Sequence, residues 1–315
     1  GLSAIPGCDA VLDEVWRDLE ASGELTVRGH LFPTLPLDGD LDRIEKLQAE
    51  LTGPMLRAPG VKQFFDGVSS AHTAWLLEPY ENPRFPDDHG HPAIPPAQMR
   101  DIVLGAAKEG IAVRIHTIGD AAVHEGVSIF EEAADKYGQP HQGRFCLEHI
   151  ENLERDDVER MAAAKIVASV QPQHVVIDIT QPARDLGEER ASFMWPFKTY
   201  LKSGVDMAFG TDSPCVPCDP AAILADAVTR QDASGAPMGG WLPEERVTAA
   251  EALRAVTLGS AVAVGRQDEL GTLEPGKFAD LIVIDKNPLS CPPQELHQAQ
   301  VLACYVGGNK VYETA

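Results

Sequence analysis

Residues 111–138, IAVRIHTIGDAAVHEGVSIFEEAADKYG, contain an apolar run that is followed almost directly by a helical pattern. The run IAVRIH (111–116) is short, nearly continuous in apolar or small residues and rich in Val and Ile. This composition is typical of a parallel strand that is buried on both faces. In AAVHEGVSIFEEAADKYG (121–138) apolar residues recur every three or four positions and a glycine ends the pattern, which indicates an amphipathic helix. The stretch therefore predicts one strand–helix unit of an α/β fold.

The same unit recurs along the chain. Further short apolar runs predict strands at residues 26–32, 61–65, 144–149, 165–171 and 205–210, and LSAI (2–5) is the expected tail of another strand. Strands that alternate with helices form a parallel sheet, and seven such units in sequence favour a closed (β/α)₈ barrel over an open sheet. A complete barrel of this type has eight strands. We therefore expect that the first strand is missing from this chain.

The pattern changes after the last helical segment, which ends near residue 265. ELGTLEPGKFADLIVID (269–285) places turn residues before a β run, and VLACYVGGNKVYE (301–313) has the pattern of a hairpin that turns at Gly307. We expect a TIM-barrel domain over residues 1–265 and the C-terminal part of a small β-sandwich module over residues 266–315.

The composition restricts the classes of function. Asp and Glu number 48 against 26 Lys and Arg, a formal net charge of −22. Such a surface repels phosphate backbones and anionic lipid headgroups, which argues against nucleic-acid and membrane partners. No apolar run reaches the roughly 18–20 residues of a membrane span, and GLSAIPGCDAVLDEVW (1–16) lacks the basic and apolar regions of a signal peptide. We therefore expect a cytoplasmic protein that acts on a small molecule.

Four of the predicted strands carry a metal ligand or proton carrier at or near one end. These residues are Lys62, His116, His149 and Asp212. Active sites of (β/α)₈ barrels lie at the carboxyl ends of the strands, and imidazole and carboxylate groups are ligands of catalytic Zn²⁺. Each residue alone has a structural explanation, such as a hydrogen-bonded core histidine, a turn-capping aspartate or a surface lysine. Their occurrence on four strands together favours a metal site.

Several longer stretches resemble the amidohydrolase superfamily, in particular the branch called amidohydrolase family 3, which contains N-substituted formamide deformylase-like and exoenzyme-regulatory-like proteins. The matching stretches are VKQFFDGVSSAHTAWLLEPY (61–80), VRIHTIGDAAV (113–123), FCLEHIENL (145–153), SVQPQHV (169–175), AFGTDSP (208–214) and TLGSAVAVGRQDELGTLEPGKFADLIVID (257–285). Together they extend over most of the chain. The resemblance implies a TIM barrel of the metal-dependent hydrolase type.

The resemblance also implies a reaction and roles for the four strand residues. It implies hydrolysis of a C–N bond, of amide or formamide type, with one or two divalent metal ions, zinc being the expected one. His116 and His149 would be metal ligands on the fifth and sixth strands. Asp212, at the end of the eighth, would bind metal and act as the general base. Lys62 would be carboxylated by CO₂ and bridge two metals, because a lysine in a closed pocket beside cations has a depressed pKa and reacts as the neutral amine.

Two further histidines would contact the carbonyl of the substrate. His174 follows the predicted seventh strand, and His72 lies in the loop after the fourth. Both assignments rest on the resemblance.

The chain departs from the family in one respect. Family members carry a His-x-His pair at the end of the first strand, whereas here the pattern occurs only as His89-Gly-His91, in a Pro-rich loop after the fourth strand. A solvated loop pair is the expected interpretation there. We therefore expect that the chain lacks the N-terminal third or more of a family member. A homo-oligomer or a partner segment would then cover the exposed strand edges of the open barrel.

Two other interpretations of the sequence stay open. One is a catalytically silent homologue with a binding or regulatory role, which the absent His-x-His pair would favour. The other is a TIM-barrel enzyme without metal, in which Lys62 is a Schiff-base nucleophile. That interpretation leaves His116, His149 and Asp212 unexplained.

Overall fold

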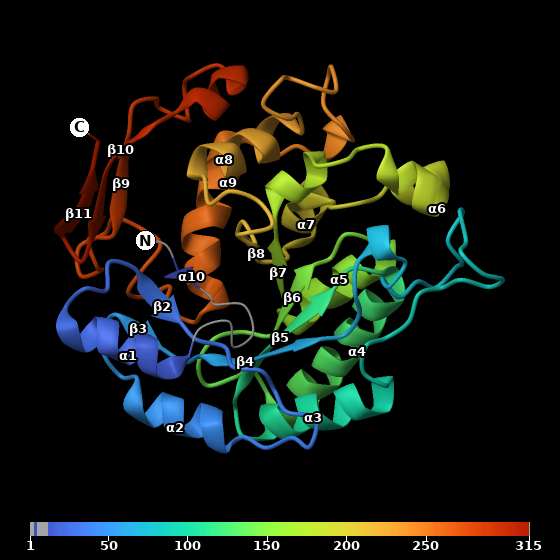
Figure 1. The fold of residues 1–315 in the computed structure, drawn as a ribbon, viewed down its shortest axis with the longest axis horizontal. Coiled ribbons are helices and arrows are strands. Elements are labelled where there is room, and N and C mark those ends of the chain that lie inside the picture. The colour runs from blue at the N-terminus through green and yellow to red at the C-terminus, as the bar shows by residue number, and fades with distance from the viewer. Residues whose placement is uncertain (1–2, 5–11, 315) are drawn as a thin grey trace.

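Five parallel strands form the central sheet of the molecule (Figure 1). In sheet order they are β4 (Gly60–Phe64), β5 (Ala112–Thr117), β6 (Cys146–His149), β7 (Val167–Val170) and β8 (Met207–Phe209). Every residue of β5, β7 and β8 is buried, as expected for parallel strands covered on both faces. The computed structural model describes residues 3–4 and 12–314. Within that part of the chain, the predicted α/β fold of strand–helix units is confirmed.

Helices connect the strands and cover the sheet. The α-helices are α1 (Asp13–Ser22), α2 (Asp42–Glu50), α3 (Pro96–Lys108), α4 (Asp120–Tyr137), α5 (Arg155–Ala164), α6 (Gln181–Ala191), α7 (Phe197–Ser203), α8 (Pro220–Thr229), α9 (Ala249–Arg254) and α10 (Ser260–Ala263). Short helical turns are η1 (Ser69–Ala71), η2 (Pro172–Val176), η3 (Pro243–Glu245), η4 (Ala255–Gly259) and η5 (Pro293–Gln298). Helices α3, α4 and α5 pack in a row against the central strands (Figure 1). None of the helices described is long and apolar enough to cross a bilayer.

A second parallel sheet continues the wall of the first. Its strands are β1 (Ser3–Ala4), β2 (Arg28–His30) and β3 (Leu56–Arg57), in that order. The segment after β2 reaches β4, because the Lys62 amide donates to the Pro33 carbonyl at 2.9 Å and the Leu35 amide donates to the Lys62 carbonyl at 2.8 Å. Of the predicted strand at 2–5, residues 2 and 5 lie outside the described residues. Among the residues described, β1 and β8 are the outermost strands of these two parallel sheets taken together.

The C-terminal segment forms a separate antiparallel sheet in the order β11-β10-β9. Its strands are β9 (Leu281–Ile284), β10 (Val301–Val306) and β11 (Asn309–Glu313). The β10–β11 turn contains Gly307 and Gly308, whose φ angles of 57° and 79° are easily adopted only by glycine. The predicted hairpin is therefore confirmed. The division into domains at residue 265 stays a prediction.

A buried ion pair joins this C-terminal segment to β2. The guanidinium of Arg28 donates through Nε and Nη2 to the Asp280 carboxylate, and Nη1 donates to the Pro54 carbonyl at 2.8 Å. The guanidinium also lies 4.1 Å from the centroid of the Phe278 ring. The two charged side chains are only 2% and 3% exposed. Residues 252 positions apart are thus held together by a desolvated, bidentate contact.

His30, the last residue of β2, is fully buried beside several arginines. Its Nε2 accepts a hydrogen bond from Arg266 Nη1 at 3.4 Å, so the imidazole is neutral. Burial, followed by the positive charges of Arg266 and Arg28, lowers the pKa of His30 to about 3.

This pKa predicts an acid-labile contribution to stability. An unfolded histidine has a pKa of about 6.5, so below that pH the unfolded chain binds a proton that folded His30 does not. The free energy of unfolding should therefore fall by up to about 1.4 kcal/mol per pH unit between pH 6.5 and 3 because of this residue. The variant His30→Gln should lack this contribution to the pH dependence of the free energy of unfolding, because glutamine does not titrate. Its amide oxygen can still accept a hydrogen bond from Arg266.

Urea unfolding of the wild type and the variant at pH 7.5, 6 and 5 measures the effect. The difference in slope should vanish above pH 6.5, where His30 is neutral in both states. Equal slopes in the two proteins between pH 6 and 5 would contradict the prediction.

Candidate active site

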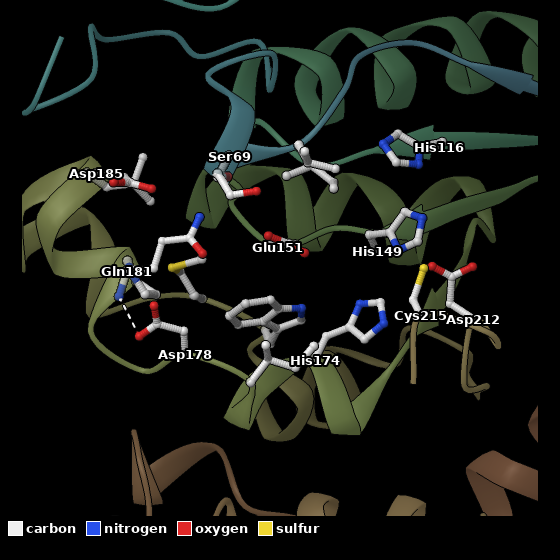
Figure 2. Close-up of a pocket in the computed structure, with 18 residues that line it drawn as sticks. Ser69, His116, His149, Glu151, His174, Asp178, Gln181, Asp185, Asp212 and Cys215 are labelled. Atoms are coloured by element: carbon white, nitrogen blue, oxygen red, sulfur yellow. Dashed lines mark hydrogen bonds between the residues drawn. The ribbon is translucent and has the colours of Figure 1, made fainter. Parts of the chain in front are cut away.

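The carboxyl ends of β5 to β8 open into a cavity of about 340 Å³ (Figure 2). Its walls include His116 from β5, His149 from the end of β6, His174 from the turn after β7, and Asp212 from the loop after β8. Each of these four successive strands, or the segment directly after it, thus contributes one metal-binding or proton-carrying side chain to the cavity. The sequence predicts an active site at this same end of the sheet.

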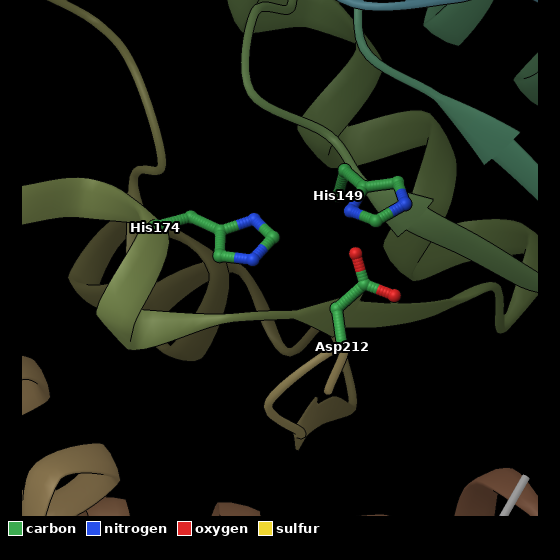
Figure 3. A group of neighbouring side chains, drawn as sticks. All are labelled: His149, His174 and Asp212. Carbon is green, nitrogen blue, oxygen red and sulfur yellow. The ribbon is translucent and has the colours of Figure 1, made fainter. Parts of the chain in front are cut away.

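Three of these side chains stand close enough to share one ion. The ligand atoms of His149, His174 and Asp212 all lie within 4.8 Å of one another (Figure 3). Imidazole nitrogens and carboxylate oxygens are the donor atoms that catalytic Zn²⁺ would use here. The ring of His116 lies 4.4 Å from the ring of His149, centroid to centroid. Two or three imidazoles and one carboxylate form a donor set that suits a divalent metal.

The imidazoles are held in their neutral, metal-binding form. Burial, and then the charge of Lys62, lowers the pKa of His116 to about 4. Burial likewise lowers the pKa of His149 and of His174. The Nδ1–H of His149 donates to Gln171 Oε1 at 3.0 Å, which leaves the lone pair on Nε2. A hydrogen bond of this kind fixes the tautomer and ring orientation of metal-binding histidines.

The backbone is strained at the ends of two of these strands. His149 and Asp212 have φ angles of 72° and 56°, in the left-handed region that non-glycine residues seldom adopt. Ile150, with φ of 47°, is a stronger outlier because its side chain is β-branched. Its amide donates to the Thr117 carbonyl at 2.9 Å, which helps to hold this conformation. Such residues cost about 1–3 kcal/mol each and cluster at functional sites.

Lys62 lies in β4, buried, and does not line the cavity. Its ammonium is paired with the carboxylate of Glu148. That carboxylate also accepts from Arg114 Nε at 2.6 Å, and Arg114 Nη2 donates to Ser169 Oγ at 2.8 Å. The ammonium is near enough to His116 and His149 to lower the pKa of both. Carboxylation of Lys62 stays a prediction.

His72 lies away from the cavity walls. Its ring is buried, its Nδ1 lies 2.7 Å from Asp88 Oδ2, and it stacks on Tyr80 with the ring centroids 4.1 Å apart. These contacts tie together the loop that follows β4. A contact between His72 and substrate stays a prediction, which the cavity geometry does not support by itself.

Two acidic residues near the site were not predicted from the sequence. Asp66 accepts hydrogen bonds from the amides of Trp75, Ile118 and Gly119 at 2.8–3.0 Å. Burial outweighs these bonds and raises the pKa of Asp66 to about 7. The carboxylate lies 3.8 Å from His116 Nε2 and holds the loops after β4 and β5 together. The position of Asp66 in the sequence could have indicated a functional role, because Asp66 directly follows the predicted strand at 61–65. Asp212 likewise follows shortly after the predicted strand at 205–210.

Glu151 is the second, and it lines the cavity two residues beyond His149. Burial, followed by the charge of Asp66, raises its pKa to about 8. Its side chain is half-buried, and no hydrogen bond or ion pair of its carboxylate is found within residues 3–4 and 12–314. The surrounding sequence, HIENL, did not indicate a functional role for Glu151.

The chain is similar to known proteins over most of its length. A family model described as "Amidohydrolase family" matches residues 10–312. Protein LONG AFTER FAR-RED 3 of Arabidopsis thaliana is 30% identical over 300 residues, which cover 95% of this chain and 50% of that protein. N-substituted formamide deformylase of Arthrobacter pascens is 29% identical over 316 residues, which cover 95% of this chain and 55% of that protein. The chain thus spans about half the length of these curated relatives.

A solved structure agrees with these matches. A metal-dependent hydrolase from Pyrococcus furiosus has a TM-score of 0.72 and 32% sequence identity, over 88% of this chain and 54% of that one. Together with the family match, this likeness confirms the predicted TIM-barrel fold of the metal-dependent hydrolase type.

Proposed function

Because the chain belongs to the amidohydrolase family, we propose that it acts in a metal-dependent hydrolase that cleaves a C–N bond of amide or formamide type. The observation that carries the proposal is the meeting of His149, His174 and Asp212 in one cavity at the carboxyl ends of the strands. The similarity to a formamide deformylase supports the choice of bond.

In this proposal His116, His149 and Asp212 would hold the metal. His174, whose donor atom lies within 4.8 Å of those of His149 and Asp212, would contact the substrate instead. Lys62, once carboxylated, would add a carbamate oxygen, and its ion pair with Glu148 would be exchanged for that contact. When bound, a divalent cation such as zinc supplies an activated water molecule and a Lewis acid. The neutral imidazoles and the carboxylate provide the donor atoms that such a cation needs.

The remaining steps fall to the side chains. The Asp212 carboxylate accepts the proton of the attacking water and returns it to the leaving amine, as a general base and then acid. Asp212 is exposed toward the cavity, so a substrate can reach it. His174 would contact the substrate carbonyl, whose oxygen gains negative charge in the transition state. Its lowered pKa keeps this ring neutral at pH 7.

Formate release from simple N-alkylformamides, measured together with metal content, tests the proposal. We expect bound divalent metal in the purified protein, loss of formate release after chelation, and recovery on addition of Zn²⁺. Full activity in the presence of chelator would overturn the metal-dependent mechanism. A folded protein that binds no added metal and releases no formate would favour the silent homologue.

A further inference from the structure

The cavity has room for more than the scissile bond of a substrate. Its volume of about 340 Å³ lies within the range of about 300–1,000 Å³ that is usual for small-molecule pockets. In Figure 2, Gln181 and Asp185 of α6 lie at the end of the cavity opposite to His116 and Asp212. A substrate whose C–N bond lies at the histidines can therefore extend toward α6.

Apolar side chains from four segments line a large part of the cavity. They come from the loop after β4, the turn after β7, helix α6 and the segment between α6 and α7. We call this set the apolar lining, and its members are Val68, Ile177, Pro182, Leu186, Met194 and Trp195. Leu186, Met194 and Trp195 are at most 5% exposed and belong to the main hydrophobic core. Packing therefore fixes this part of the apolar lining.

Val68 and Ile177 differ from these three residues because they stay exposed. Val68 is 40% exposed and Ile177 is 64% exposed, although both are large apolar residues. In Figure 2 their neighbours in the sequence, Ser69 and Asp178, lie toward the top and the bottom of the cavity. Large apolar side chains that stay exposed in a cavity offer surface that a bound ligand can remove from water.

Hydrogen bonds of the backbone hold both exposed side chains in place. The Val68 amide donates to Thr73 Oγ1 at 2.9 Å, and the Val68 carbonyl accepts from the Thr73 amide at 3.1 Å. Ile177 ends the 3₁₀ turn η2, and its amide donates to the His174 carbonyl at 3.4 Å. Side chains three residues apart in such a turn lie on the same side, so Ile177 lies beside His174. The apolar surface is thus formed before a ligand binds, which lowers the entropic cost of binding.

The two carboxylates at the α6 end of the cavity already have partners. Asp178 Oδ1 accepts from the Thr180 amide at 3.0 Å, from the Thr180 hydroxyl at 2.6 Å and from the Gln181 amide at 3.3 Å. Asp185 Oδ1 accepts from Arg184 Nε at 3.0 Å. Asp185 is also only 1% exposed, so a ligand has little access to its carboxylate. Neither side chain therefore calls for a cationic ligand.

We propose that Val68 and Ile177 bind an uncharged, apolar substituent on the nitrogen of the scissile C–N bond and thereby select the substrate. The carbonyl carbon of a formamide carries only hydrogen, so such a group must be on the nitrogen. An alkyl chain gains free energy when it covers these two side chains, whereas a charged or hydroxyl end group loses its hydration there. The inference rests on the proposed hydrolase function for the position of the scissile bond.

Three formamides whose substituents have equal length test the substrate class. N-pentylformamide ends in a methyl group, N-(4-hydroxybutyl)formamide in a hydroxyl and N-(4-aminobutyl)formamide in an ammonium group. Calorimetry on the Asp212→Asn protein measures binding without turnover. We expect the Kd of the pentyl compound to be at least about fivefold lower than the Kd of either other compound.

Two variants in this background locate the contact. Val68→Ser and Ile177→Ser each remove exposed apolar surface from the cavity. Each should raise the Kd of the pentyl compound at least about threefold and that of the hydroxybutyl compound less than about twofold. Leu289→Ser is the matched control and should change neither Kd, because Leu289 is 63% exposed and does not line the cavity. Unchanged far-UV circular dichroism and thermal midpoint in each variant exclude loss of fold.

The outcomes separate this inference from the proposed function. Equal Kd values for the three compounds, or tighter binding of the aminobutyl compound, would overturn it even if the wild-type protein releases formate from all of them. A pentyl preference that Val68→Ser and Ile177→Ser both keep, or that Leu289→Ser also loses, would overturn it too. A pentyl preference that falls only in the two cavity variants, in a protein that releases no formate, would support the apolar binding site and count against the hydrolase proposal.

Discussion

Replacing Asp212 by asparagine should lower kcat for C–N hydrolysis by about 10²- to 10⁴-fold, the usual contribution of a general acid–base group. The amide cannot take up the proton of the attacking water, and it is a weaker metal ligand than a carboxylate. Asparagine is the suitable replacement because Asp212 has a φ of 56° and asparagine tolerates this left-handed conformation. The fold should therefore survive while the chemistry is lost. Steady-state formate release from an N-alkylformamide measures the effect.

His174→Gln provides the comparison for that variant. If His174 contacts the substrate carbonyl as proposed, the variant should keep its metal content and lose activity. Loss of metal from His174→Gln would instead make this histidine a ligand, which its position within 4.8 Å of the donor atoms of His149 and Asp212 also permits. A kcat of Asp212→Asn within threefold of the wild type would contradict the role of Asp212 as general base.

The second large effect concerns stability and lies far from the cavity. Breaking the Arg28–Asp280 ion pair by Arg28→Met or Asp280→Leu should lower the free energy of unfolding by about 3–5 kcal/mol, because either change leaves one buried charge unpaired. Asp280 would lose both guanidinium contacts, keeping the Gly307 amide at 2.7 Å as a donor. Urea unfolding at pH 7.5 measures the loss.

The double variant Arg28→Met/Asp280→Leu is the control for this prediction. With both charges removed, the desolvation penalty disappears together with the attraction, so the double variant should recover much of what either single variant loses. Additive losses in the double variant, or single variants within 1 kcal/mol of the wild type, would contradict the argument.

Much of the fold could be predicted because its signals are local. The apolar run and the three-to-four-residue pattern in residues 111–138 correspond to β5 and α4, with each of the four boundaries displaced by one residue. Gly307 marks a hairpin turn because the backbone there needs a positive φ. Strand ends also gave His116, His149 and Asp212, since parallel strands of one sheet end on the same side.

Contacts between distant residues were decided only by the tertiary structure. The pairing of Lys62 with Glu148, the three amides that meet at Asp66 and the absence of a partner for Glu151 in the described residues depend on how separate loops pack. The ion pair between Arg28 and Asp280 spans 252 positions and has no local signature. Periodicity and turn chemistry act over a few residues, so the elements that depend on them can be predicted from the sequence. Which side chains are desolvated together, and which find a partner, is set by packing across the whole chain.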